Sequence, residues 1–166
     1  MTVDELTAAW LAAWSGRDPD AFSALSVGSL HYEDPVTAAP LRGPSELAAH
    51  AERLWEGLPA ARLEASGSVV ASGKFAVIPA LLSGTQTAPL GAIPATGRRL
   101  VVQCVFFCEL DGEPAAGADL RLRRVRAFFD LYAAGVQLGV LPAHGTLREK
   151  ALLMLQGFGL RAGGDE

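Results

Sequence analysis

The chain has 166 residues and a mass of 17.4 kDa, which is enough for one domain with its own hydrophobic core. Half of the residues are apolar, 19% are charged and the formal net charge is −4, so the chain lacks the basic composition that nucleic-acid binding requires. Because no apolar run reaches the roughly eighteen residues of a membrane-spanning helix, we expect neither nucleic acid nor a membrane as a partner.

The mean hydropathy of +0.25 is high for a soluble monomer and favours a large internal cavity, an oligomer interface, or both. The N-terminus shows no basic-then-apolar signal pattern, so the expected location is the cytoplasm. Cys104 and Cys108 lie four residues apart in one apolar strand pattern. They are too far apart to form a disulfide and have no metal-ligand spacing around them. We therefore expect buried free thiols, no metal site and no cofactor.

Three helices are predicted in the first third of the chain. A T-x-x-E capping box and apolar residues at three- and four-residue spacing predict a helix over residues 2–16, with Trp10 and Trp14 on its buried face. Asp18-Pro19 indicates the start of a second, short helix that runs to about residue 25. The third is expected over residues 44–58, with Trp55 on its apolar face.

Between the second and third helices, residues 30–34 alternate in the manner of a short strand, which places Tyr32 and Asp34 on the same face. Pro35 ends the strand, so Asp34 occupies its last extended position. A carboxyl group there, facing an apolar interior, can have its pKa raised by desolvation and act as a general base. The alternative is an aspartate that accepts hydrogen bonds from its own loop in an Asx turn.

The remaining two thirds of the chain predict a sheet. Strands are expected over residues 62–71, 75–85, 98–110 and 120–129, with a bulge or free edge at Pro79 because proline removes a ladder donor. The strand over residues 98–110 is apolar on both faces, with Phe106 on one of them. This pattern is typical of a sheet covered on one side by helices and on the other by a second subunit, so we expect a homodimer.

Charged residues on and after these strands carry further hypotheses. Four arginines in residues 121–126 form a basic patch, read either as a solvated strand face or as a docking site for an acidic acyl carrier domain. Asp130 follows the last strand and precedes a helix over residues 131–139, where it is suited to cap that helix. Beyond Pro142, a second capping box at Thr146 predicts one more helix, which either closes over a pocket or packs across a dimer.

The segment LHYEDPVTAAPLRG, residues 30–43, resembles the ketosteroid-isomerase branch of the NTF2-like superfamily. The resemblance covers residues 1–142 and implies an α+β fold, a cone of N-terminal helices packed on a curved, mostly antiparallel sheet; residues 143–166 form a C-terminal helical extension and tail. In that branch the aspartate that corresponds to Asp34 is the general base. The tyrosine and aspartic acid that complete its oxyanion hole are replaced here by Trp10 and Phe106. The Trp10 indole N–H is then the donor left, with plain core packing as the alternative.

Two further resemblances concern the reaction. Limonene epoxide hydrolases hold the attacking water with a tyrosine at the place of Tyr32, but their arginine and two aspartates are missing from this chain. GAIPATGRR at residues 91–99 and D-x6-Q-L-G from Asp130 resemble SnoaL-like polyketide cyclases, in which that aspartate acts as an acid/base. The related polyether epoxide-opening enzymes suggest Glu64 as a second carboxylate beside Asp34.

These patterns predict a cofactor-independent cyclase, isomerase or epoxide-opening enzyme for a small hydrophobic, polyketide- or terpenoid-like substrate. Asp34 is the expected base, Tyr32 its hydrogen-bonding partner and Asp130 a second acid or electrostatic stabiliser. The residues expected to bind substrate or shape its pocket are Trp10, Trp14, Trp55, Glu64, Phe106 and Phe129. The alternatives are a binding protein without chemistry, which would tolerate Asp34→Asn, and an assembly module that uses the apolar sheet face.

Overall fold

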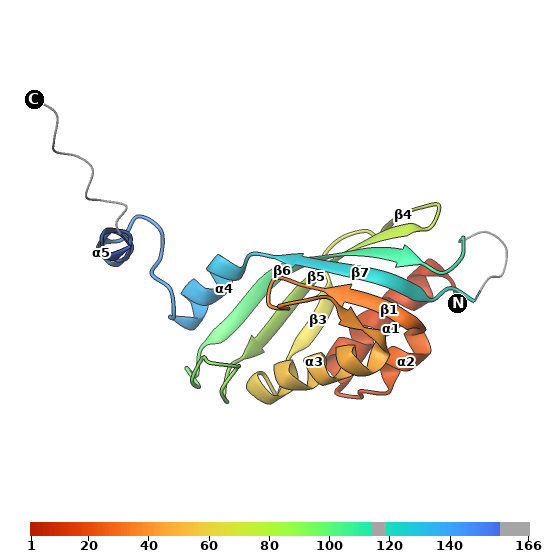
Figure 1. The fold of residues 1–166 in the computed structure, drawn as a ribbon, viewed down its shortest axis with the longest axis horizontal. Coiled ribbons are helices and arrows are strands. Elements are labelled where there is room, and N and C mark those ends of the chain that lie inside the picture. The colour runs from red at the N-terminus through yellow and green to blue at the C-terminus, as the bar shows by residue number, and fades with distance from the viewer. Residues whose placement is uncertain (114–118, 157–166) are drawn as a thin grey trace, which may run out of the picture.

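The computed structural model describes residues 1–113 and 119–156, and has an α+β architecture. Three helices, α1 (Val3–Gly16), α2 (Ala21–Leu25) and α3 (Gly43–Gly57), lie on one side of a curved sheet (Figure 1). The expected capping box is present at the start of α1, where Thr2 and Glu5 exchange hydrogen bonds. The start of α2 was predicted two residues too early: Asp18 accepts the Asp20 N–H in a turn, and the helix begins only after it.

The sheet of the described residues follows the strand order β2-β1-β7-β6-β5-β3, and β4 pairs with β5. Its strands are β1 (Ser26–Glu33), β2 (Leu41–Arg42), β3 (Arg62–Ala65), β4 (Val70–Ser72), β5 (Phe75–Thr85), β6 (Arg99–Leu110) and β7 (Leu122–Phe129). The pair β1–β7 is parallel and the other pairs are antiparallel. The predicted helices on a mostly antiparallel sheet are therefore confirmed.

Pro79 explains why the single strand predicted over residues 62–71 is divided into β3 and β4. Pro79 lies in the middle of β5, and its carbonyl accepts the N–H of Ser66. In an antiparallel pair the N–H and C=O of one residue point to the same neighbour, so the donor that proline lacks would also face this side. The chain leaves the ladder here, between the pairs Ala65–Ala80 and Val70–Val77. The expected irregularity at Pro79 is confirmed.

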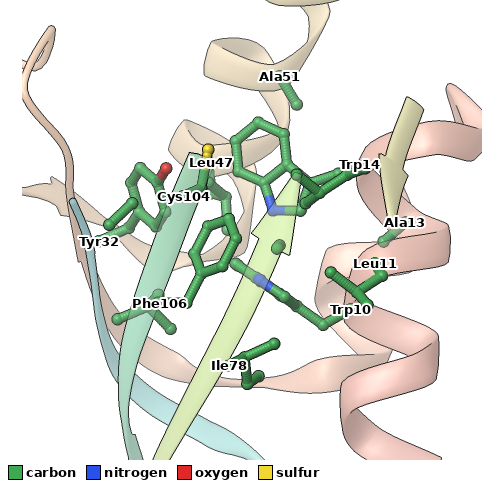
Figure 2. Close-up of a cluster of buried hydrophobic side chains, with 14 of the residues drawn as sticks. Trp10, Leu11, Ala13, Trp14, Tyr32, Leu47, Ala51, Ile78, Cys104 and Phe106 are labelled. Atoms are coloured by element: carbon green, nitrogen blue, oxygen red, sulfur yellow. The ribbon is translucent and has the colours of Figure 1, made fainter. Parts of the chain in front are cut away.

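An aromatic cluster joins α1 to the inner face of the sheet. Trp10 and Phe22 are fully buried, with ring centroids 5.7 Å apart in an edge-to-face arrangement. Trp10 contacts Phe106 on β6 in the same geometry, also at 5.7 Å. Figure 2 shows Trp10, Trp14, Tyr32 and Phe106 converging from α1, β1 and β6. Such edge-to-face pairs stabilise a core beyond their area burial by about 1 kcal/mol each.

The outer face of the sheet is apolar and exposed in this chain. Phe75, Val105, Phe107 and Phe128 are each at least 38% exposed, and the cross-strand pair Val105–Phe128 lies on it. The dimer expected across this face stays a prediction. In the predicted basic patch, Arg121, Arg123 and Arg126 each pair with an acidic residue, Asp119, Glu109 and Glu33 respectively. These pairings leave less free positive charge for an acidic carrier domain than the sequence suggested.

Two helices follow the sheet, α4 (Leu131–Leu138) and α5 (Leu147–Leu155). Figure 1 shows α5 apart from the helix-and-sheet body, and α5 buries none of its residues. The idea that this helix closes over a pocket is therefore not met, whereas packing across a dimer stays a prediction. The tail from residue 157 lies outside the described residues. Among those described, no helix combines the length and apolar character needed to cross a membrane.

Candidate functional site

Asp34 lies directly after β1, at the point where Pro35 ends the strand. Its Oδ1 accepts the backbone N–H groups of Val36, at 2.9 Å, and Thr37, at 3.0 Å. This is the Asx-type turn that the sequence analysis left open as an alternative. The turn does not remove Asp34 from the interior, because its side chain is only 5% exposed. Asp34 therefore both closes the turn and presents its second oxygen to the core.

The second oxygen of Asp34 receives two side-chain donors. Tyr32, two residues earlier on the same strand face, donates its hydroxyl to Oδ2 at 3.0 Å, as the strand periodicity predicted. His50, on the face of α3 turned toward the sheet, places Nε2 2.7 Å from the same oxygen. Because a carboxylate has about four acceptor positions, the four donors around Asp34 leave none free.

This hydrogen bonding decides the ionisation of the pair Tyr32–Asp34. Burial by itself would raise the pKa of Asp34, but the hydrogen bond and the charge interaction with His50, together with hydrogen bonds from the Val36 N–H and Tyr32, outweigh it and lower that pKa below its ordinary value. Burial, reinforced by the negative charge of Asp34, raises the pKa of Tyr32 well above its ordinary value. At neutral pH Asp34 is therefore a carboxylate and Tyr32 a neutral phenol. The raised pKa expected for a general base at Asp34 is not found.

The partner of the other imidazole nitrogen defines the tautomer of His50. Arg53, one turn later on α3, places a guanidinium nitrogen 3.3 Å from His50 Nδ1. A guanidinium is always protonated and can only donate, so in a neutral imidazole this contact favours a lone pair on Nδ1. The imidazole proton then lies on Nε2 and is donated to Asp34. This arrangement resembles an aspartate that orients a histidine base, with Nδ1 as the basic atom.

These groups lie in the wall of a cavity of about 860 Å³. Of the predicted residues, Tyr32, Asp34, Trp14, Phe106 and Phe129 line the cavity. Its polar lining comes mainly from the turn after β1 and from α3, whereas α4, the loop before β6 and the inner sheet face contribute mostly apolar side chains. The volume is near the upper end of ordinary ligand pockets, which span roughly 300–1,000 Å³. The cavity suits an apolar molecule with a few polar groups at one edge.

Three predicted substrate-binding residues do not line the cavity. Trp10 is fully buried behind the wall, and its Nε1 has no partner among the described residues, so it supplies no donor to a ligand. Trp55 is buried as well, and its Nε1 donates to the Trp14 carbonyl at 2.7 Å. Glu64 is exposed, since on β3 it is the neighbouring Leu63 that turns inward. Their assignments to the pocket are corrected accordingly.

Asp130 is exposed and does not line the cavity either. Its Oδ1 accepts the Ala133 N–H at 2.8 Å, which makes it the N-cap of α4. Gln137, at the other end of the D-x6-Q-L-G pattern, pairs with the backbone of Val101 through two hydrogen bonds of 2.8 and 2.9 Å. The amide thus extends β6 beyond the end of its pairing with β7. In this chain the pattern holds α4 against the sheet, as the capping alternative for Asp130 requires.

Gln86, directly after β5, also has a structural role. Its buried amide bonds to Ile93, Pro94 and Thr96 of the loop before β6. That loop contributes Leu90 and Ile93 to the cavity wall. Among the described residues, no group of three or more His, Cys, Asp or Glu side chains is arranged to hold a metal ion.

The sequence matches the model of the SnoaL-like domain over residues 7–116, which is more than half of the chain. The chain belongs to the SnoaL-like family. No curated protein sequence matches it.

Solved structures confirm the NTF2-like, ketosteroid-isomerase-like fold. One is TsrD from Streptomyces laurentii, with 27% identity, a TM-score of 0.69, and 84% of this chain and 96% of TsrD covered. Another is a hypothetical protein with a ketosteroid isomerase-like fold from Catenulispora acidiphila, with 19% identity, a TM-score of 0.68 and coverages of 88% and 99%.

A protein from Jannaschia, described as a candidate SnoaL-like polyketide cyclase, is similar at 20% identity with a TM-score of 0.69, over 84% of this chain and 92% of that one. This similarity concerns the fold. The residue that the sequence analysis missed in this SnoaL-like chain is His50. A signal was present, because His50 follows Leu47 by three residues and precedes Leu54 by four, on the apolar face of α3.

Proposed function

We propose that this SnoaL-like protein is a cofactor-independent enzyme that cyclises or isomerises a hydrophobic, polyketide-like substrate by acid–base catalysis. The observation that carries the proposal is the hydrogen-bonded pair of Asp34 and His50, joined at 2.7 Å in the wall of a large, mainly apolar cavity. Family membership and the names of the similar cyclases support the general class of reaction.

The roles we assign differ from those expected from the sequence. Asp34 has a lowered pKa and no free acceptor position, so it is a poor base but a good orienting group for His50. His50 Nδ1 is the base, since Nε2 carries the proton that Asp34 accepts. Tyr32 donates to the same Oδ2 and helps to keep the carboxylate in place. Asp130 has no part in the proposed reaction, because it caps α4 outside the cavity.

The same geometry favours a particular kind of substrate. An imidazole is a moderate base, and the cavity wall supplies few donors to stabilise an enolate. A carbon flanked by two carbonyl groups suits such a site, because its enolate spreads the charge over two oxygens of the substrate itself. His50 Nδ1 takes the proton, and the carbon's electron pair attacks a carbonyl carbon of the same molecule. The new C–C bond closes the ring, and the proton on His50 passes to the resulting alkoxide.

Proton abstraction can be tested before the natural substrate is known. We suggest following the exchange of the protons beside the carbonyl of 2-tetralone for deuterium in D₂O by proton NMR. The wild-type protein is expected to accelerate exchange over buffer, and His50→Gln to remove about 10²-fold or more of that acceleration. Asp34→Asn is expected to cause a loss of similar size, whereas Tyr32→Phe, which leaves His50 and three of the four Asp34 donors in place, is expected to lose less than about tenfold.

Binding of 2-tetralone, measured in parallel by chemical-shift changes in the protein, separates the two main outcomes. Bound 2-tetralone without faster exchange in the wild-type protein would favour the binding-protein alternative. Faster exchange that survives in His50→Gln would remove the base from His50 and contradict the proposed mechanism.

A further inference from the structure

Arg53 is the one cationic side chain, apart from the histidine, among the described residues that line the cavity. It is exposed, and its guanidinium contacts His50 Nδ1 at 3.3 Å. Within residues 1–113 and 119–156, no carboxylate lies within ion-pair distance of it. Glu46 also lines the cavity, and its carboxylate accepts the backbone N–H of Arg42 at 2.7 Å. Among the described residues, the Arg53 guanidinium therefore has no carboxylate partner, and it lies beside the basic atom of the cavity.

The contact between Arg53 and His50 leaves most of the guanidinium free. A guanidinium has five N–H donors in a planar fork, and one long hydrogen bond to a neutral nitrogen uses one of them. A carboxylate is a stronger partner, because it binds the fork through two parallel, charge-assisted hydrogen bonds. Exposure of Arg53 also suits an ionic ligand group, since a charge kept near water avoids the large cost of full burial.

We propose that Arg53 recognises a carboxylate of the substrate, and that the substrate is an apolar, ring-sized acid whose carboxylate stays at the cavity mouth. This inference rests on the proposed function and names the substrate class of the same site. Exposed lining residues mark the mouth, among them Val36 at 57% and Val140 at 44%. When the guanidinium turns to the carboxylate it leaves His50 Nδ1, so the same ligand that fills the cavity uncovers the base.

The test compares two probes of nearly equal shape, anthraquinone-2-carboxylate and anthraquinone-2-carboxamide, by isothermal titration calorimetry. The wild-type protein is expected to bind the acid about tenfold more tightly than the amide, as charge-assisted hydrogen bonds at a partly hydrated site allow. Arg53→Gln should abolish this preference while binding the amide as the wild type does. Arg62→Gln, an equal change of charge on the exposed face of β3, should keep it.

Equal affinity of the wild type for the two probes would overturn the proposal, as would a preference that survives in Arg53→Gln or the binding of neither probe. If Arg53→Gln fails to bind even the amide, Arg53→Lys decides. A lysine keeps the charge but not the fork, so a reduced preference supports the proposal and an unchanged one contradicts it. The deuterium-exchange assay tests the proposed function independently of this one. Faster exchange without a preference for the acid would support His50 as the base and contradict the role of Arg53. A preference for the acid without faster exchange would indicate an anion-binding pocket that performs no proton transfer.

Discussion

Asp34→Asn is predicted to reverse the tautomer of His50. An amide has one acceptor oxygen and an NH₂ group with two donors, so it cannot accept from all four donors that surround Asp34. If its oxygen keeps the N–H groups of Val36 and Thr37, its NH₂ group faces Tyr32 and His50. The phenol can rotate and accept. His50 can accept only if its proton moves from Nε2 to Nδ1, where it then faces the Arg53 guanidinium.

The size of the effect follows from the bonds that change. All four charge-assisted hydrogen bonds to Asp34 become neutral ones, each about 1 kcal/mol weaker, and the contact between Arg53 and His50 is lost. The neutral amide no longer bears the cost of burying a charge, which offsets about half of this loss. We expect the free energy of unfolding to fall by about 2 kcal/mol. For a domain of this length that corresponds to a decrease in melting temperature of roughly 4–8 °C. The protein should still fold, because the turn after β1 keeps both backbone hydrogen bonds.

Ring nitrogen-15 NMR measures the tautomer directly, since protonated and unprotonated imidazole nitrogens have very different shifts. The chain has three histidines, and a His50→Gln spectrum assigns the signals of His50. Tyr32→Phe is the matched control: it removes one donor to Oδ2 but leaves the proton of His50 on Nε2. A wild-type His50 protonated on Nδ1, or a tautomer unchanged in Asp34→Asn, would refute the reasoning.

Three further predictions concern pH, α4 and assembly. The folded-state pKa of Asp34 lies below its ordinary value of 3.8. The stability that Asp34 contributes is therefore fully present above that value and is lost as the pH falls through the lowered pKa. In urea unfolding between about pH 5 and pH 2, the free energy of unfolding should fall less in Asp34→Asn than in the wild type. Gln137→Ala removes both hydrogen bonds to Val101 and should lower the free energy of unfolding by about 1 kcal/mol, whereas Gln103→Ala on the exposed sheet face should not. If the outer sheet face pairs two chains, Phe128→Glu should give monomers in light scattering, and a wild-type monomer would contradict this.

Local patterns in the sequence were sufficient for the elements and for half of the site. Strand parity placed Tyr32 and Asp34 on one face, and their hydrogen bond follows from that placement. The capping box at Thr2 and the irregularity at Pro79 also depend on residues close in sequence or on backbone chemistry alone. The motif in residues 30–43 indicated the cone-shaped fold, which the match to the SnoaL-like domain and the similar structures confirm.

Only the tertiary structure decided which groups meet Asp34. His50 is sixteen residues away on another element, and an apolar helix face gives no sign of the oxygen that its one polar residue will reach. The pKa of Asp34 was predicted in the wrong direction because burial was visible in the pattern, whereas His50, the partner that lowers this pKa most, reaches Asp34 only when α3 packs on β1. Asp130 had the spacing of a catalytic acid, yet its place outside the cavity depends on where α4 docks against β6. Sequence spacing determines which residues share a face, but packing between elements determines what that face touches.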